Sequence, residues 1–200
     1  MRSALTEAMR PIVGLLLAAG SSRRFGRDKL LQPLPDGTPM VAASARILAA
    51  ATDRVIVLVR PQQPALQEIL TKLPVDVLEV ADAAAGMGVT LAAGVRAAAD
   101  AAGWVIALAD MPCVQVGTVS AVVSALRKGA AIAAPFHCGR RGHPVGFAAH
   151  WFDALTSLDG DQGARNLLRA HGDSISRVEV LDPRCLFDVD TPSDLESLRL

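Results

Sequence analysis

The stretch that decides the fold runs Val13-Gly-Leu-Leu-Leu-Ala-Ala-Gly-Ser-Ser-Arg-Arg-Phe-Gly-Arg-Asp-Lys-Leu-Leu31. It begins within an apolar run from Ile12 to Ala19, which is typical of a strand buried on both faces. The glycine and two serines that follow leave several backbone N–H groups free, and three arginines and the lysine Lys29 come next. Free N–H groups beside fixed cations suit a polyphosphate. We therefore interpret the stretch as a first strand followed by a nucleoside-triphosphate loop, rather than as an ordinary basic surface loop.

Two cations of this loop are the expected triphosphate contacts. They are Arg24 and Lys29, whereas Arg23 and Arg27 are expected to be solvated neighbours, because alternate positions of an extended loop point apart. The loop has neither the GxxxxGK[ST] spacing nor the GxGxxG fingerprint. The nucleotide is expected to contact Leu17, Ala18, Ala19, Gly20, Ser22, Arg24 and Lys29.

Apolar runs and helical patterns alternate along the rest of the chain. Strands are expected at 12–19, 54–59, 75–80, 104–109, 130–135, 145–148, 177–181 and 186–189. Helices are expected at 40–51, 62–72, 89–100, 115–127, 150–156, 160–171 and 192–200. This alternation predicts an α/β fold, a three-layer αβα domain with a mostly parallel sheet. We expect an N-terminal arm over residues 1–11 and a single domain over 12–200.

Composition excludes several classes of function. Lys and Arg together number 20, as do Asp and Glu, so the zero net charge disfavours non-specific nucleic-acid binding. No apolar run reaches the roughly 18 residues of a membrane span. The three cysteines have no metal-ligand spacing and are expected to be reduced thiols. We therefore expect a cytoplasmic protein with no nucleic-acid or membrane partner.

Two carboxylates are candidate Mg²⁺ ligands. Asp110 directly follows the apolar run Val105-Ile-Ala-Leu-Ala109, so it is expected at the carboxyl edge of a central strand. Asp190 closes the Asp188-Val189-Asp190 run and lies nearer the strand end than Asp188. Carboxylates beside phosphates are typical Mg²⁺ ligands, although Asp110 is also suited to cap a helix. Thr191 is expected to cap the last helix, with Pro192 at its first position.

Three glycine-containing segments are expected to bind a second substrate, the acceptor. Residue His143 is held extended by the proline after it, and a structural role is an equally good interpretation. Arg165 stands in the first turn of a helix, where a cation is unfavourable for the helix dipole unless an anion is bound. The expected acceptor-binding residues are Met87, Thr90, His143, Gln162 and Arg165.

The motifs together resemble the MobA-like nucleotidyltransferases, and within that family its molybdenum cofactor cytidylyltransferase branch. They are Leu17-Ala-Ala-Gly-Ser-Ser-Arg-Arg-Phe-Gly-Arg-Asp-Lys29, Leu108-Ala-Asp-Met-Pro112, Arg141-Gly-His-Pro144, Gly160-Asp-Gln-Gly-Ala-Arg165 and Asp188-Val-Asp-Thr-Pro192. The resemblance implies a Rossmann-like fold of the nucleotide-diphospho-sugar-transferase type. It also implies a reaction in which an acceptor phosphate attacks the α-phosphorus of a nucleoside triphosphate and releases pyrophosphate.

The resemblance also implies roles for single residues and partners. Arg24, Lys29 and Asp110 would be catalytic, and Asp110 and Asp190 would hold Mg²⁺ as the cofactor. CTP and a molybdopterin-type acceptor would be the substrates, and the product would pass to a molybdenum hydroxylase or its maturation chaperone. Ala19 stands where the guanylyl branch usually has glycine, and its methyl group can narrow the pocket against a purine.

Two departures and several alternatives remain at this point. Phe25 stands where methionine is usual, and Gly88-Val89-Thr90 stands where a serine-rich run is common. Ala19 also occurs in other cytidylyl and sugar-nucleotide enzymes. The alternatives are a guanylyl- or sugar-phosphate nucleotidyltransferase, a nicotinamide-dependent reductase on the same scaffold, and a non-catalytic carrier of the pterin cofactor. Two metal carboxylates argue against the carrier, which has no use for them.

Overall fold

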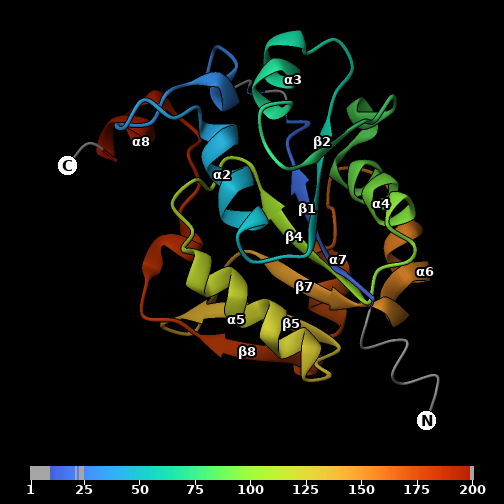
Figure 1. Cartoon of the computed structure of the whole chain (residues 1–200). Helices are drawn as coiled ribbons and strands as arrows, with labels where there is room; N and C mark the ends of the chain where they lie inside the picture. Colours follow the sequence, from blue (N-terminus) through green and yellow to red (C-terminus); the bar gives the residue numbers. More distant parts are fainter. Residues whose placement is uncertain (1–9, 21, 23–24, 199–200) are drawn as a thin grey trace.

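The computed structural model describes residues 10–20, 22 and 25–198. Within these residues one eight-stranded sheet runs in the order β3-β2-β1-β4-β7-β5-β6, with β8 paired to β5 (Figure 1). The strands are β1 (Ile12–Leu17), β2 (Arg54–Val59), β3 (Asp76–Glu79), β4 (Gly103–Leu108), β5 (Ile132–His137), β6 (Arg140–Arg141), β7 (Val145–Ala148) and β8 (Ile175–Glu179). The expected mostly parallel sheet is confirmed, with β6 and β7 as its antiparallel members.

Helices cover both faces of the sheet. They are α2 (Met40–Ala49), α3 (Pro64–Leu70), α4 (Met87–Ala97), α5 (Val116–Arg127), α6 (Phe152–Thr156), α7 (Arg165–Ala170) and α8 (Pro192–Ser197). Side chains of β1 alternate between two buried clusters: Ile12 and Leu16 pack with α2, α3 and α5, whereas Val13 and Leu15 pack with α4, α6 and α7. Burial on both faces explains why β1 reads as an unbroken apolar run. The three-layer αβα fold is therefore confirmed.

The order of the parallel strands creates a switch point beside β1. The chain proceeds from β1 outwards to β2 and β3, and then returns to place β4 on the other side of β1. The connection after β1 therefore runs towards one edge of the sheet and the connection after β4 towards the other, although their helices, α2 and α5, pack on the same face. In open α/β sheets, ligands bind at the carboxyl ends of the strands at such a point. This geometry places the loop after Leu17 next to Asp110.

The expected strand at 186–189 is wrong. Residues Pro183–Leu186 form a 3₁₀ helix, η5, which begins where the Asp182 side chain accepts a hydrogen bond from the Arg184 backbone. The chain then runs outside any strand, and the Val189 backbone N–H donates to the Asp110 carbonyl at 2.8 Å. Val189 is fully buried in the core, so its apolar side chain gave a strand-like pattern without a ladder of backbone pairs.

The remaining differences are local. The expected loop at 138–144 contains the short strand β6, which pairs with the end of β5 as a hairpin. Most of the expected N-terminal arm lies outside the described residues, but the Pro11 carbonyl accepts from the Ala102 backbone N–H at 2.8 Å and so extends the pairing of β1 with β4. Within the described part of the chain, none of the helices has the length and apolar character needed to cross a membrane.

The start of α4 is locked against the loop before α7. The Gly88 backbone N–H donates to the Gly160 carbonyl at 2.8 Å. A Cβ atom at Gly88 would lie 2.2 Å from the Asp159 carbonyl oxygen, which is backbone and cannot swing aside. Only glycine therefore allows the two segments to approach this closely.

We predict that Gly88→Ala destabilises the fold by about 2 kcal/mol or more, because the added methyl group overpacks a backbone contact. Gly117→Ala is the matched control: it occupies the same second position of its helix, α5, and its Cβ would meet nothing within 4 Å. This control should stabilise the protein by about 0.5 kcal/mol. Urea unfolding of both variants checks the difference, and equal stabilities would contradict the close contact.

Candidate functional site

Three charged side chains meet at the switch point. The Lys29 Nζ atom lies 2.8 Å from the Asp110 Oδ2 atom and 3.0 Å from the Asp190 Oδ1 atom. Lys29 comes from the 3₁₀ helix η1 (Lys29–Leu31), Asp110 follows β4, and Asp190 precedes α8. Residues more than 160 positions apart in the sequence therefore form one cluster. These are three of the residues that the sequence analysis selected.

The backbone around the cluster is fixed by hydrogen bonds. The Ser44 hydroxyl of α2 donates to the Ala109 carbonyl at 2.9 Å, which anchors the chain immediately before Asp110. The Asp190 backbone N–H donates to the Asp194 Oδ2 atom at 3.0 Å. The same Asp194 carboxylate forms a capping box with Thr191, which is the N-cap of α8 as expected. The start of α8 thus holds Asp190 in place.

Lys29 remains charged within this cluster. The ammonium group is largely buried, and burial by itself would lower the pKa of Lys29. The hydrogen bonds and charges of Asp110, followed by those of Asp190, outweigh burial and raise the pKa above its ordinary value. Among the described residues, the Lys29 ammonium group thus contacts both carboxylates.

The two carboxylates fit a magnesium ion. The Asp110 Oδ1 atom is buried and has no hydrogen-bond partner among the described residues, so its lone pairs are available to a ligand. Mg²⁺ prefers oxygen ligands and is commonly held by one or two carboxylates together with substrate phosphates and water. Within the described ranges, no group of three or more acidic, histidine or cysteine side chains gathers as a metal site. The carboxylate pair would therefore share the ion with phosphate oxygens.

The loop after β1 lies beside this cluster. Ala18 is buried, Ala19 is half-buried and Gly20 is exposed, so the chain emerges from the core over these three residues. Ser22 adopts a positive φ of 49°, and its Oγ atom accepts from the Lys29 backbone N–H at 3.3 Å. This contact closes the loop onto η1. Arg24, the second expected triphosphate contact, lies outside the described residues.

A pocket of about 180 Å³ lies on the α4 side of the sheet. Four of the five expected acceptor-binding residues line it: Met87, His143, Gln162 and Arg165. Leu17, which we expected to contact the nucleotide, lines this pocket as well. The fifth expected residue, Thr90, is not part of the lining: its side chain is buried and its hydroxyl donates to the Gly86 carbonyl at 3.2 Å. Such a bond within a helix occupies a threonine hydroxyl.

Arg141 is the charged residue in the lining of this pocket that the sequence analysis did not select. It lines the pocket together with Arg165, and burial followed by the neighbouring Arg165 charge lowers its pKa. Two guanidinium groups that repel each other form a site for an anion. The available signal was its place in the Arg141-Gly-His-Pro144 run, two residues before His143. We refer to this hollow as the acceptor pocket.

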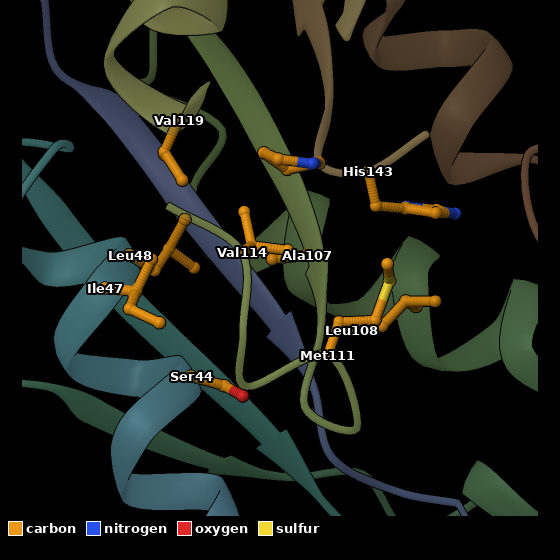
Figure 2. A pocket seen from close by; sticks show the side chains of 10 residues that line it. Ser44, Ile47, Leu48, Ala107, Leu108, Met111, Val114, Val119 and His143 are labelled. Carbon is orange, nitrogen blue, oxygen red and sulfur yellow. The ribbon is translucent and has the colours of Figure 1, made fainter. Parts of the chain in front are cut away.

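His143 reaches the site because β7 is antiparallel to β4. Ile106 of β4 pairs with Val145 of β7, so the start of β7 lies beside the carboxyl end of β4. The ring points away from α2 (Figure 2) and lines both the acceptor pocket and a small cavity of about 20 Å³, which is too small for a substrate. Burial and then the Arg141 charge lower the pKa of His143 to about 4, against the opposing pull of Asp110 and the Ile106 backbone.

We predict that His143 makes the folded protein less stable as the pH is lowered. Its pKa is about 4 in the folded protein against 6.5 ordinarily, so the unfolded chain binds more protons between these values. The contribution of His143 to the free energy of unfolding is complete above pH 6.5 and is lost as the pH falls towards 4. This contribution amounts to about 3 kcal/mol. Urea unfolding across this range should show a shallower pH dependence for His143→Gln, and parallel curves would contradict a buried neutral imidazole.

The fold and the site together define a class. A mostly parallel α/β sheet with a loop after its first strand and two carboxylates at its switch point is the architecture of Rossmann-like nucleotidyltransferases. Residues 14–175 match the MobA-like NTP transferase domain, and the chain belongs to that family.

Similar proteins have different names. The purine catabolism protein PucB of Bacillus subtilis is 31% identical over 94% of this chain and 96% of its own length. Nicotine blue oxidoreductase of Paenarthrobacter nicotinovorans is 29% identical over 94% and 96% of the two chains. A probable molybdenum cofactor guanylyltransferase of Mycobacterium tuberculosis is 44% identical, over 46% of this chain and 43% of its own length.

A solved structure covers nearly the whole chain. The crystal structure of Rv0371c from Mycobacterium tuberculosis has a TM-score of 0.80 and 29% identity over 95% of this chain and 98% of its own. Rv0371c has also been crystallised in complex with manganese, a structure with a TM-score of 0.78 and 26% identity over 94% and 97% of the two chains.

Proposed function

We propose that this protein transfers CMP from CTP to the phosphate of a molybdopterin-type acceptor in a Mg²⁺-dependent reaction, and releases pyrophosphate. The observation that carries the proposal is the meeting of Lys29, Asp110 and Asp190 at the switch point, beside the loop after β1. Membership of the MobA-like family supports nucleotidyl transfer as the reaction. The manganese complex of Rv0371c supports a divalent ion as cofactor.

The chemistry needs charge and positioning rather than an enzyme nucleophile. An oxygen of the acceptor phosphate forms a bond to the α-phosphorus of CTP, and the bond from that phosphorus to the pyrophosphate oxygen breaks. Lys29, with Arg24, would hold the triphosphate, and Arg141 and Arg165 would hold the acceptor phosphate. Mg²⁺ held by Asp110 and Asp190 would supply neutralisation of the charge that builds on the phosphates.

The choice of CTP over GTP rests on Ala19. Ala19 lies where the chain leaves the core between β1 and the loop, and its methyl group would narrow the space that a glycine would leave for a purine. The relative named as a guanylyltransferase favours GTP as the rival nucleotide, and the one named nicotine blue oxidoreductase favours a reductase as a second function. Each rival requires a different co-substrate, so a single set of assays separates them.

The decisive assay offers each of the four nucleoside triphosphates with molybdopterin and Mg²⁺, and measures pyrophosphate release. The proposal expects release with CTP well above that with GTP, ATP or UTP. NADPH oxidation is measured in parallel to test the reductase. Preferred use of GTP would reassign the base, and NADPH oxidation without any pyrophosphate release would overturn the proposal.

We predict that Asp110→Asn lowers turnover by about 10²-fold or more, because it removes a main electrostatic element of the transition state. The substitution keeps the size of the side chain, so the fold should be retained. Steady-state rates at saturating CTP and Mg²⁺ check this. The same substitution at the exposed Asp188 is the control and should leave turnover unchanged. Near-normal turnover of folded Asp110→Asn would remove Asp110 from the metal site.

Lys29→Ala is expected to weaken CTP binding by about tenfold or more, because a charge-assisted contact to the triphosphate is lost. Calorimetric titration with CTP and Mg²⁺ measures the change, and circular dichroism confirms that the variant is folded. Lys128→Ala removes an exposed lysine at the end of α5 and should bind CTP normally. An unchanged affinity in Lys29→Ala would contradict the assignment of the loop.

A further inference from the structure

A second and larger hollow, of about 490 Å³, adjoins the acceptor pocket. Arg141 and Leu168 line both, so the two hollows adjoin at these side chains. Strands β5 and β8 and the end of α7 form its other walls. A volume of this size accommodates a small heterocyclic ligand. We call it the distal hollow.

The distal hollow has a stacked cation on its β-sheet wall. The guanidinium carbon of Arg177 lies 4.0 Å from the ring centroid of Phe136. Arg177 pairs in register with Ala134 of β5, so it lies on the same face of the sheet as Phe136 two residues on. Its Nε atom donates to Glu179 at 3.1 Å, which helps to fix the guanidinium over the ring. A planar cation placed in this way is a surface on which a flat ring can stack.

The charges of the distal hollow favour an anion that also bears N–H donors. Arg141 and Arg169 line it, and within the described part of the chain neither guanidinium forms an ion pair or a hydrogen bond. Asp173 lies in the same lining and offers carboxylate oxygens that accept hydrogen bonds. A ligand with a negative group towards the arginines and N–H groups towards Asp173 would therefore bind to both the guanidinium groups and the carboxylate.

We propose that the distal hollow binds the ring end of the acceptor, a planar N–H-bearing heterocycle with an anionic substituent, while the acceptor phosphate lies between Arg141 and Arg165. This inference rests on the proposed function for the identity of the acceptor. The ring stacks on Arg177, its anionic substituent meets Arg169, and its N–H groups meet Asp173. The acceptor thus spans two adjoining hollows, and Arg141 contacts both of its ends.

The direct test uses pterin-6-carboxylate, a fluorescent, planar and anionic probe, without CTP and without Mg²⁺. Fluorescence titration of the full chain should give saturable binding. Arg177→Gln and Arg169→Gln should each raise the Kd by about tenfold, and Arg177→Lys should raise it less, because lysine keeps the charge but not the plane. Arg140→Gln is the matched control: it is an exposed arginine of the neighbouring hairpin, outside both hollows, and should change the Kd by less than about twofold.

Three results would overturn the inference. They are no saturable binding to the wild-type chain, an unchanged Kd in Arg177→Gln, and an equal loss in Arg140→Gln. A fourth result concerns the ring alone: displacement of the probe by inorganic phosphate at a concentration comparable with that of the probe would overturn the assignment of a ring. Since no nucleotide is present, these results stand whether or not CTP proves to be the substrate. In the transfer assay, Arg177→Gln should raise KM for the acceptor and leave kcat and KM for CTP unchanged.

Discussion

The site depends on the position of one ammonium group between two carboxylates. Lys29 bridges Asp110 and Asp190, and each of the three comes from a different part of the chain. Without the lysine, two partly buried negative charges would face each other, a costly arrangement. The lysine therefore draws η1, the end of β4 and the start of α8 together. The same arrangement leaves the buried Asp110 Oδ1 atom available to a metal ion.

The sheet order explains why these groups can meet. β1 and β4 are parallel neighbours whose connections run towards opposite edges of the sheet, so their carboxyl ends frame one opening. Antiparallel β7 then brings His143 to the same edge, with its ring on the acceptor side. The acceptor pocket and the distal hollow continue from this edge along α7 towards β8. A phosphate at Arg141 and Arg165 would therefore lie between the reacting cluster and the rest of the acceptor.

The sequence was sufficient for the features that periodicity and strand order determine. β1 and β4 are buried on both faces, so their continuous apolar runs identified them, and Asp110 followed from the end of such a run. The capping of α8 followed from the Thr191-Pro192 pair, which acts locally. The cations of the loop and the carboxylate run at 188–190 selected Lys29 and Asp190, and the family motifs agreed, but the sequence did not show that the lysine turns inwards to bridge both carboxylates.

Features that depend on tertiary packing could not be predicted in this way. A short apolar run does not state its direction, so the antiparallel course of β7 was not foreseen. Residues 186–189 include a buried valine but pair with no neighbouring strand. The pattern of apolar residues alone does not distinguish such a segment from a strand. Thr90 appeared suited to a substrate, yet its hydroxyl bonds within α4. Arg141 was not selected because it lies close to Arg165 only in the folded protein, where β6 and α7 come together across the fold.

A double-mutant cycle on Lys29 and Asp110 tests the central interaction most directly. The free energies of unfolding of Lys29→Met, Asp110→Asn and the double variant would be measured at neutral pH by urea denaturation. The account predicts that the double variant is less destabilised than the sum of the single variants, with a coupling energy of about 1–3 kcal/mol. Additivity of the two single effects, within about 0.5 kcal/mol, would contradict the bridge on which the site is built.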